Sequence, residues 1–148
     1  MSNVSNNPIK DIIIPVAGLG SRLFPMTLAV PKNLLSVGEK TLIQYAVEES
    51  LLCGAERIHI ICSKAHLELY KNQFKATDEI REMLDKKGKE LLKARVEGLT
   101  SVWDKLNFIV QEQPLGLGHA VLQAKPFVQG TFGVILPDDL ILEGQEAT

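Results

Sequence analysis

Residues 12–22 read Ile-Ile-Ile-Pro-Val-Ala-Gly-Leu-Gly-Ser-Arg, and this stretch decides the fold. Its first six residues are continuously apolar, which is typical of a strand covered on both faces of a sheet. The two glycines that follow, Gly18 and Gly20, allow the backbone to turn tightly and to bring its N–H groups close to a ligand. The stretch therefore predicts a buried strand that carries a binding loop at its carboxyl end.

Strands and helices alternate along the rest of the chain. The charged segment 77–99 has an apolar stripe with Gly88 in its middle, which predicts one amphipathic helix interrupted near Gly88 or two short helices. The other predicted elements are the strands 12–17, 57–62, 107–111 and 132–136 and the helices 41–54, 66–74 and 118–125. This order predicts an α/β fold, a Rossmann-like and mostly parallel sheet with helices on both faces and right-handed crossovers.

Length and composition narrow the class of protein. The chain has 148 residues, of which 45% are apolar and 23% charged, and its net charge is -2. This length suits one domain, residues 1–148, and the charge argues against a general nucleic-acid surface. No apolar run approaches the roughly 20 residues of a membrane span, and the polar N-terminus has no signal-peptide pattern. We expect a cytoplasmic protein with neither nucleic acid nor membrane as a partner.

Two cations accompany the glycine loop. Arg22 and Lys32 lie in a segment, 12–38, that contains no acidic residue, so we expect a local positive field without an internal partner. A turn between surface cations is the simpler alternative, because glycines at strand ends are common and Leu23 stands where the dinucleotide fingerprint has its third glycine. Together, the glycines and cations favour binding of a polyphosphate.

A second glycine cluster joins the third predicted strand to a helix. It contains Gln111, whose side chain offers an amide donor and a carbonyl acceptor, and it continues through Gly116 and Gly118. The amide pair suits the imide edge of a pyrimidine, whereas a tight turn with a surface glutamine is the alternative. His119 alone is more typical of a packed or capping histidine than of a catalytic one.

Asp138 and Asp139 end the fourth predicted strand. Carboxylates are suited to Mg²⁺ that bridges phosphates, although Pro-Asp-Asp also fits an acidic turn. Because the carboxyl ends of parallel strands meet at one edge of a sheet, we expect this turn and the two glycine loops to converge on one crevice.

These blocks resemble the sugar-phosphate nucleotidylyltransferases, and within them the bacterial UTP–glucose-1-phosphate uridylyltransferases. The similar positions are Ile14–Arg22, Pro25, Thr27, Pro31, Lys32, the block 42–45, the block 116–120 and the block 136–138. The resemblance runs from Ile9 to about Leu142. Two blocks depart from the family pattern. Residues 31–36 read Pro-Lys-Asn-Leu-Leu-Ser, with Asn33 where a glutamate is usual in Pro-Lys-Glu-Met-Leu-Pro, and Thr41 stands where a proline is usual.

The resemblance implies roles for particular residues. Uracil would lie against Ala17, Gly18, Gln111 and Gly116; the triphosphate would contact Arg22 and Lys32 near Gly20; and Asp138 would ligate Mg²⁺ as the cofactor. The reaction implied is uridylyl transfer from UTP to glucose 1-phosphate, which gives UDP-glucose and pyrophosphate. Arg22 favours the catalytic lineage, because a regulatory paralogue in the family lacks this arginine.

Other readings stay open on the sequence alone. The family's enzymes are considerably longer and only nine residues follow Asp139, so we expect a truncated nucleotidyltransferase fold, incomplete at its C-terminus. The chain could then be a UTP-binding or regulatory homologue without turnover, or it could use another sugar phosphate or base. Members of the family associate, which leaves homo-oligomerisation open.

Overall fold

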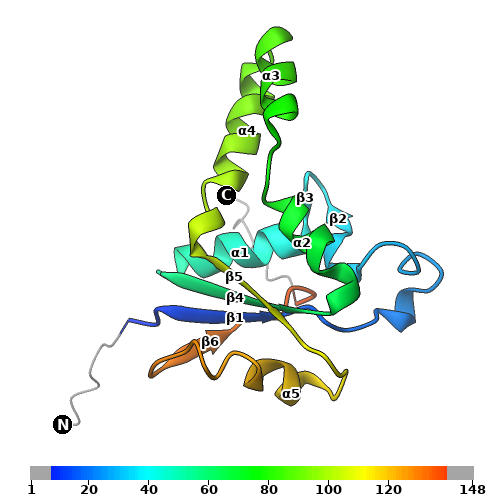
Figure 1. The fold of residues 1–148 in the computed structure, drawn as a ribbon, viewed down its shortest axis with the longest axis vertical. Helices are drawn as coiled ribbons and strands as arrows, with labels where there is room; N and C mark the ends of the chain where they lie inside the picture. Colours follow the sequence, from blue (N-terminus) through cyan, green and yellow to red (C-terminus); the bar gives the residue numbers. More distant parts are fainter. Residues whose placement is uncertain (1–7, 140–148) are drawn as a thin grey trace, which may run out of the picture.

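Four parallel strands form the central sheet of the computed structural model, which describes residues 8–139 (Figure 1). Their order across the sheet is β5-β4-β1-β6. The strands are β1 (Asp11–Pro15), β4 (Arg57–Cys62), β5 (Leu106–Val110) and β6 (Phe132–Val134). A separate antiparallel pair joins β2 (Ser36–Val37) to β3 (Lys40–Thr41). The predicted α/β class with a parallel sheet is confirmed.

The two central strands are buried on both faces. In β1, Ile12 and Ile14 belong to one apolar cluster, whereas Ile13 belongs to a second cluster with Ala120 and Ala124. This division follows from the alternation of side chains along a strand, and it explains why the run from residue 12 is continuously apolar. One run of sequence therefore supplies the core on both sides of the sheet.

Helices lie on both faces of the sheet, as predicted. The helices α1 (Leu42–Leu52) and α2 (Leu67–Gln73) cover one face, and α5 (Leu117–Leu122) covers the other (Figure 1). Thr41 starts α1, because its Oγ1 accepts a hydrogen bond from the Gln44 amide at 3.4 Å. The helices α3 (Asp78–Lys86) and α4 (Glu90–Thr100) pack together and project away from the sheet (Figure 1). Segment 77–99 is thus two helices rather than one.

Most predicted elements extend past the observed ends, and α5 and β6 show why. After α5, the Gln123 and Ala124 amides bond to carbonyls three residues back, so the chain tightens into turns before Pro126. The strand β6 ends at Val134, although the Ile135 amide still donates to the Ile13 carbonyl at 3.0 Å. Both differences concern the last turn or the last residues of an element.

A buried polar network lies at the amino ends of the strands. Asp11 has no exposed surface, and both of its carboxylate oxygens accept hydrogen bonds from Arg57 at 2.7 Å. His59 lies 2.8 Å from the same carboxylate through Nε2, and its Nδ1 lies 3.1 Å from the Asn107 amide. The Arg57 guanidinium, hydrogen-bonded to the carboxylate, lowers the pKa of Asp11 to about 2.

The strand order places a switch point beside β1. The chain runs outward from β1 through β4 to β5 and then returns to β6 on the other side of β1. Ligands of open parallel sheets bind where the order reverses, beyond the carboxyl ends of the strands. Within residues 8–139, no helix has the length and apolar character needed to cross a membrane.

Candidate functional site

A cavity of about 360 Å³, named here the strand-edge cavity, opens at the carboxyl ends of the strands. Three loops form it: the one after β1, the one between β5 and α5, and the one after β6. Its lining comprises Pro15, Ala17, Gly18, Gln111, Pro114, Gly116, Leu117, Ala120, Leu136 and Asp138. The predicted convergence of the three loops is therefore observed, and five of the eight predicted site residues line the same space.

The other three predicted residues line a smaller neighbouring pocket. This phosphate-side pocket has a volume of about 270 Å³ and is lined by Gly20, Ser21, Arg22, Leu23 and Lys32. The two cations thus lie together in the pocket that adjoins the strand-edge cavity. Such a division suits a ligand with a flat end and an anionic end.

The two glycines of the first loop serve different purposes. Gly20 has a φ of +63°, and a Cβ there would come within 3.1 Å of the Lys32 Cβ and 3.3 Å of the Thr27 Cγ2. A Cβ at Gly18 would meet no atom within 4 Å. Gly20 is therefore required by the fold of the loop, whereas Gly18 leaves open space beside the cavity.

Thr27 was not predicted as a functional residue, yet it holds the loop in place. Its Oγ1 donates to the Gly20 carbonyl at 2.7 Å, and its side chain is buried. The signal in the sequence was a single hydroxyl among apolar residues seven positions after Gly20. Thr27 therefore fixes the loop that carries Arg22.

Lys32 has an internal partner, so the prediction of an unpaired positive field is wrong. Its Nζ donates to Asp138 Oδ2 at 2.7 Å, across 106 positions of sequence. The contact lowers the pKa of the Asp138 carboxyl, and Arg22 adds to this effect by its charge. The two side chains are 28% and 49% exposed, so the pair can be exchanged for a ligand. Arg22 forms no ion pair within the described part of the chain.

Gln111 is held from two sides. Its backbone amide donates to the Cys62 carbonyl at 2.9 Å, at the end of the neighbouring strand. Its side-chain Nε2 lies 3.3 Å from the Gly116 carbonyl oxygen and 2.8 Å from His119 Nδ1. Gly116 has a φ of +97°, which favours glycine at the point where this loop enters α5.

Asn33, at the position of the family glutamate, does not line either pocket. It is 6% exposed and follows Lys32 in a short 3₁₀ turn, Lys32–Leu34. Its buried Oδ1 has no hydrogen-bond partner among residues 8–139. The departure at Asn33 therefore leaves the lining of both pockets unchanged.

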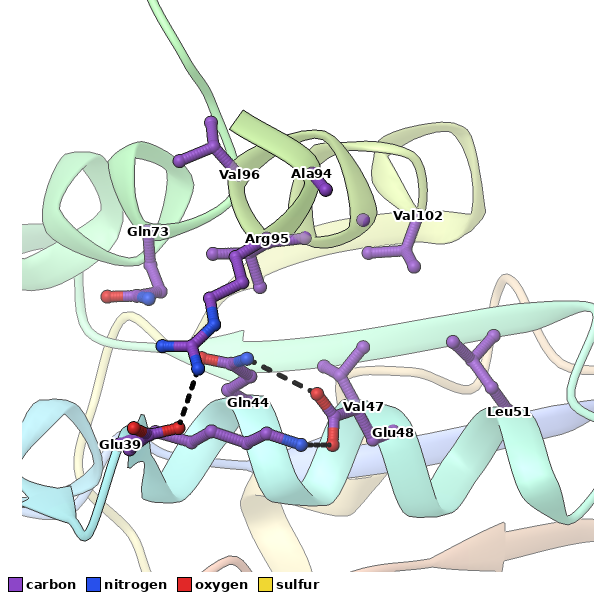
Figure 2. A pocket seen from close by; sticks show the side chains of 13 residues that line it. Glu39, Gln44, Val47, Glu48, Leu51, Gln73, Ala94, Arg95, Val96 and Val102 are labelled. Carbon is purple, nitrogen blue, oxygen red and sulfur yellow. Dashed lines mark hydrogen bonds and ion pairs between the residues drawn. The ribbon is translucent and has the colours of Figure 1, made fainter. Parts of the chain in front are cut away.

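A second and larger cavity lies on the helical face, between α1 and α4 (Figure 2). This helix-face cavity has a volume of about 590 Å³. Its charged groups are paired with one another: Arg95 lies 3.3 Å from Glu39, and Lys40 lies 2.6 Å from Glu48 (Figure 2). Neither the strand ends of the central sheet nor the two glycine loops line it, so its size alone does not indicate a site.

The donor set limits which metal sites are conceivable. Among residues 8–139, no group of three or more His, Cys, Asp or Glu side chains could hold a metal ion. Asp138 is a half-exposed, ionised carboxylate beside the phosphate-side pocket. One carboxylate together with ligand phosphates is a usual environment for Mg²⁺, so Asp138 fits this ion rather than zinc.

Comparison with known proteins agrees with this geometry. The family described as nucleotidyl transferase matches residues 11–147. The chain belongs to this family. The chain is 42% identical to UTP–glucose-1-phosphate uridylyltransferase of Streptococcus pyogenes and 37% identical to that of Bacillus subtilis. Each match spans 134 residues, which is 90% of this chain. The structure of UTP-bound UGPase from Acinetobacter baumannii matches with a TM-score of 0.84 and 36% identity over 92% of this chain.

The match covers only part of each relative. It spans 43% of the Streptococcus protein, 45% of the Bacillus protein and 48% of the Acinetobacter chain. The chain thus corresponds to under half the length of these relatives. Membership of the family and the nucleotidyltransferase fold follow from the comparisons, and the activity of the relatives is carried over only as a proposal.

Proposed function

We propose that the chain binds UTP in the strand-edge cavity and supplies the nucleotide half of a site for uridylyl transfer to glucose 1-phosphate. The products are UDP-glucose and pyrophosphate. The observation that carries this proposal is the arrangement of three loops around one cavity, with Lys32 and Arg22 in the adjoining pocket. The relatives named uridylyltransferase support the choice of nucleotide and sugar.

The base belongs in the strand-edge cavity. Ala17, Gly18, Gln111 and Gly116 line this space. Gly18 presents no side chain, so a flat ring can approach the backbone closely. The triphosphate then extends past Gly20 toward the two cations.

Transfer needs no protein nucleophile. A phosphate oxygen of glucose 1-phosphate attacks the α-phosphorus of UTP in line; the bond from that phosphorus to the bridging oxygen breaks, and pyrophosphate leaves with the electron pair. Lys32 and Arg22 position the phosphates and stabilise the charge that develops on the leaving group. Lys32 turns from Asp138 to the phosphates when the nucleotide binds, because the triphosphate carries more negative charge than one carboxylate.

Asp138 is the residue that would hold Mg²⁺. When bound, the ion would neutralise phosphate charge between Asp138 and the nucleotide. Release of Asp138 by Lys32 makes the carboxylate available, and an aspartate carboxyl is ionised at neutral pH without help from the lysine. This release accompanies the arrival of the phosphates.

A second function, UTP binding without turnover, is favoured by one observation. Among residues 8–139, Asp138 is the sole acidic residue that lines the two pockets. A chain that binds but does not turn over would act as a binding or regulatory module. The two functions share the same nucleotide site.

Two measurements test the proposal. Isothermal titration with UTP and Mg²⁺ reports binding, and pyrophosphate release in the presence of glucose 1-phosphate reports turnover. We expect binding, and binding without release would assign the module. If turnover is found, Lys32→Ala should reduce it by about a hundredfold or more. Unchanged UDP-glucose synthesis in this variant, or no UTP binding by the unmodified chain, would contradict the proposal.

A further inference from the structure

The side-chain amide of Gln111 is oriented by two acceptors. Gln111 is 7% exposed, and its Nε2 lies 3.3 Å from the Gly116 carbonyl and 2.8 Å from His119 Nδ1. A carbonyl oxygen only accepts hydrogen bonds, so the atom facing it must be the amide nitrogen. The opposite orientation would bring Gln111 Oε1 against the Gly116 oxygen. The Nε2 hydrogens are therefore directed at Gly116 and His119.

The orientation of the Gln111 amide also determines which ring nitrogen of His119 carries the proton. Its Nδ1 must accept a hydrogen bond, so its proton resides on Nε2. Gln123 lies near the other side of the ring, with its Nε2 3.2 Å from His119 Nε2 and 3.1 Å from the His119 carbonyl. Two donors cannot bond to each other, so one of the two glutamines must turn its amide.

Gln123 is the one that can turn. It is half-buried at the C-terminal end of α5, whereas Gln111 is buried directly after β5. Rotation of the Gln123 amide lets its Oε1 accept from His119 Nε2 and replaces its bond to the His119 carbonyl by an oxygen–oxygen contact, which a half-buried side chain can relieve by shifting toward solvent. Rotation of Gln111 would also give up one bond, the one to the Gly116 carbonyl, but Gln111 is 7% exposed and its oxygen would stay against the Gly116 oxygen without access to water. His119 Nδ1 is therefore the acceptor that holds the Gln111 amide in this orientation.

The consequence appears in the strand-edge cavity, which Gln111 lines and His119 does not. Because both Nε2 hydrogens are engaged, Oε1 is the polar atom that Gln111 can offer to a ligand. Within residues 8–139, no side chain or backbone group donates to this oxygen. A ligand atom that meets it must be a donor.

We propose that His119 is a positioning residue that locks the Gln111 amide with its carbonyl oxygen toward the base, so that the site selects uracil over cytosine. Uracil presents an N3–H donor to this oxygen, whereas cytosine presents an unprotonated N3, which repels it. This inference rests on the proposed nucleotide function and adds to it the residue that sets the base preference.

The first test compares UTP and CTP binding, each with Mg²⁺, by isothermal titration. We expect the unmodified chain to bind UTP at least about tenfold more tightly than CTP. In His119→Ala the Gln111 amide is released, and the preference should fall to about twofold or less. In His119→Asn it should persist, because Oδ1 is bonded to Cγ as Nδ1 is and can accept in its place.

Gln123→Ala is the matched control, because Gln123 contacts the same ring without touching Gln111; it should keep the preference. A general loss of stability would weaken the binding of both nucleotides and leave the ratio of their affinities unchanged. His119→Ala with the original ratio would overturn the role of His119 while leaving UTP binding in place. Failure of the unmodified chain to bind either nucleotide would overturn the proposed function and this inference together.

The second test needs neither a ligand nor a variant. Nitrogen-15 NMR of the histidine rings distinguishes a protonated ring nitrogen from an acceptor. At neutral pH we expect His119 to carry its proton on Nε2, with Nδ1 accepting from Gln111. A proton on Nδ1 would overturn the inference, because Gln111 would then have to face His119 with its oxygen.

Discussion

Asp11 and Asp138 are both carboxylates held by a cation, at opposite ends of the same sheet, and they differ in what surrounds them. Asp11 is fully buried and bonded to Arg57 through two contacts and to His59 through a third. Asp138 is half-exposed and has one contact to Lys32. The first carboxylate is saturated by protein, whereas the second can exchange its partner.

The difference separates groups that support the fold from groups available to a ligand. Breaking a buried ion pair leaves an uncompensated charge, which is costly, whereas an exposed pair contributes little to stability. The amino end of the sheet should therefore govern unfolding, and the carboxyl end should govern nucleotide binding. The helix-face cavity, whose charges are also paired internally, should govern neither.

The largest effect is expected at the amino end. Arg57→Met removes the charge that faces buried Asp11 and should lower the free energy of unfolding by roughly 3–5 kcal/mol. Urea denaturation measures this, and Lys10→Met is the control, since Lys10 pairs with Glu56 on the surface and should cost about 1 kcal/mol or less. Equal losses in the two variants would show that the buried network contributes no more to stability than a surface ion pair does.

Lys32→Ala should show the reverse pattern. We expect binding of UTP with Mg²⁺ to weaken roughly tenfold to a hundredfold, because a charged hydrogen bond to phosphate is worth about 1.5–3 kcal/mol. Unfolding should change by about 1 kcal/mol or less. Lys40→Ala, in the helix-face cavity, is the matched control and should leave titration with UTP unchanged. Comparable weakening in both lysine variants would break the comparison.

Acid should remove the contribution that Asp11, at the amino end of the sheet, makes to the free energy of unfolding. The folded-state pKa of Asp11 lies near 2, below its ordinary value of 3.8, so its contribution is complete above pH 3.8 and is lost as pH falls toward 2. The loss amounts to roughly 2 kcal/mol. Denaturation at pH 5 and at pH 2.5 measures it, and Asp11→Asn should flatten this dependence. A variant that keeps the full slope would assign the acid sensitivity to other carboxyls.

The smallest effect distinguishes the two glycines of the first loop. Gly20→Ala should destabilise the chain by roughly 1–2 kcal/mol, because a side chain at this positive φ is strained and contacts Lys32. Gly18→Ala should leave unfolding nearly unchanged and weaken UTP binding, since its methyl group enters open space at the cavity. Thermal denaturation measures the first effect and titration with UTP the second. A loss of stability in Gly18→Ala with none in Gly20→Ala would contradict the roles given to these two glycines.

The fold could be predicted well because its signals are local. The apolar run from Ile12 and the stripe in α1 each specify one element, and parallel order then brings the strand ends together. The ends of α5 and β6 were predicted too far along the chain, because the tightening before Pro126 depends on turn geometry rather than on apolar spacing. The break at Gly88 was visible, but the packing of α3 on α4 was not.

The site could be predicted only as a set of residues. Which loops converge follows from strand polarity, so Gly18, Gln111 and Asp138 could be placed at one edge. Partners far apart in sequence could not be predicted, as the pairs Lys32–Asp138 and Asp11–Arg57 show. The orientation of an amide, as at Gln111, depends on atoms that only the folded loop brings together.

Amide chemical shifts of the unmodified chain during titration with UTP and Mg²⁺ test the central claim most directly, because they locate the nucleotide without any variant. The largest changes are expected at Gly18, Gly20, Gln111 and Gly116, around the strand-edge cavity. Residues of the helix-face cavity, such as Gly98 and Leu99, should not move. Changes centred on Gly98 and Leu99, or none at the strand ends under saturating UTP, would contradict the account.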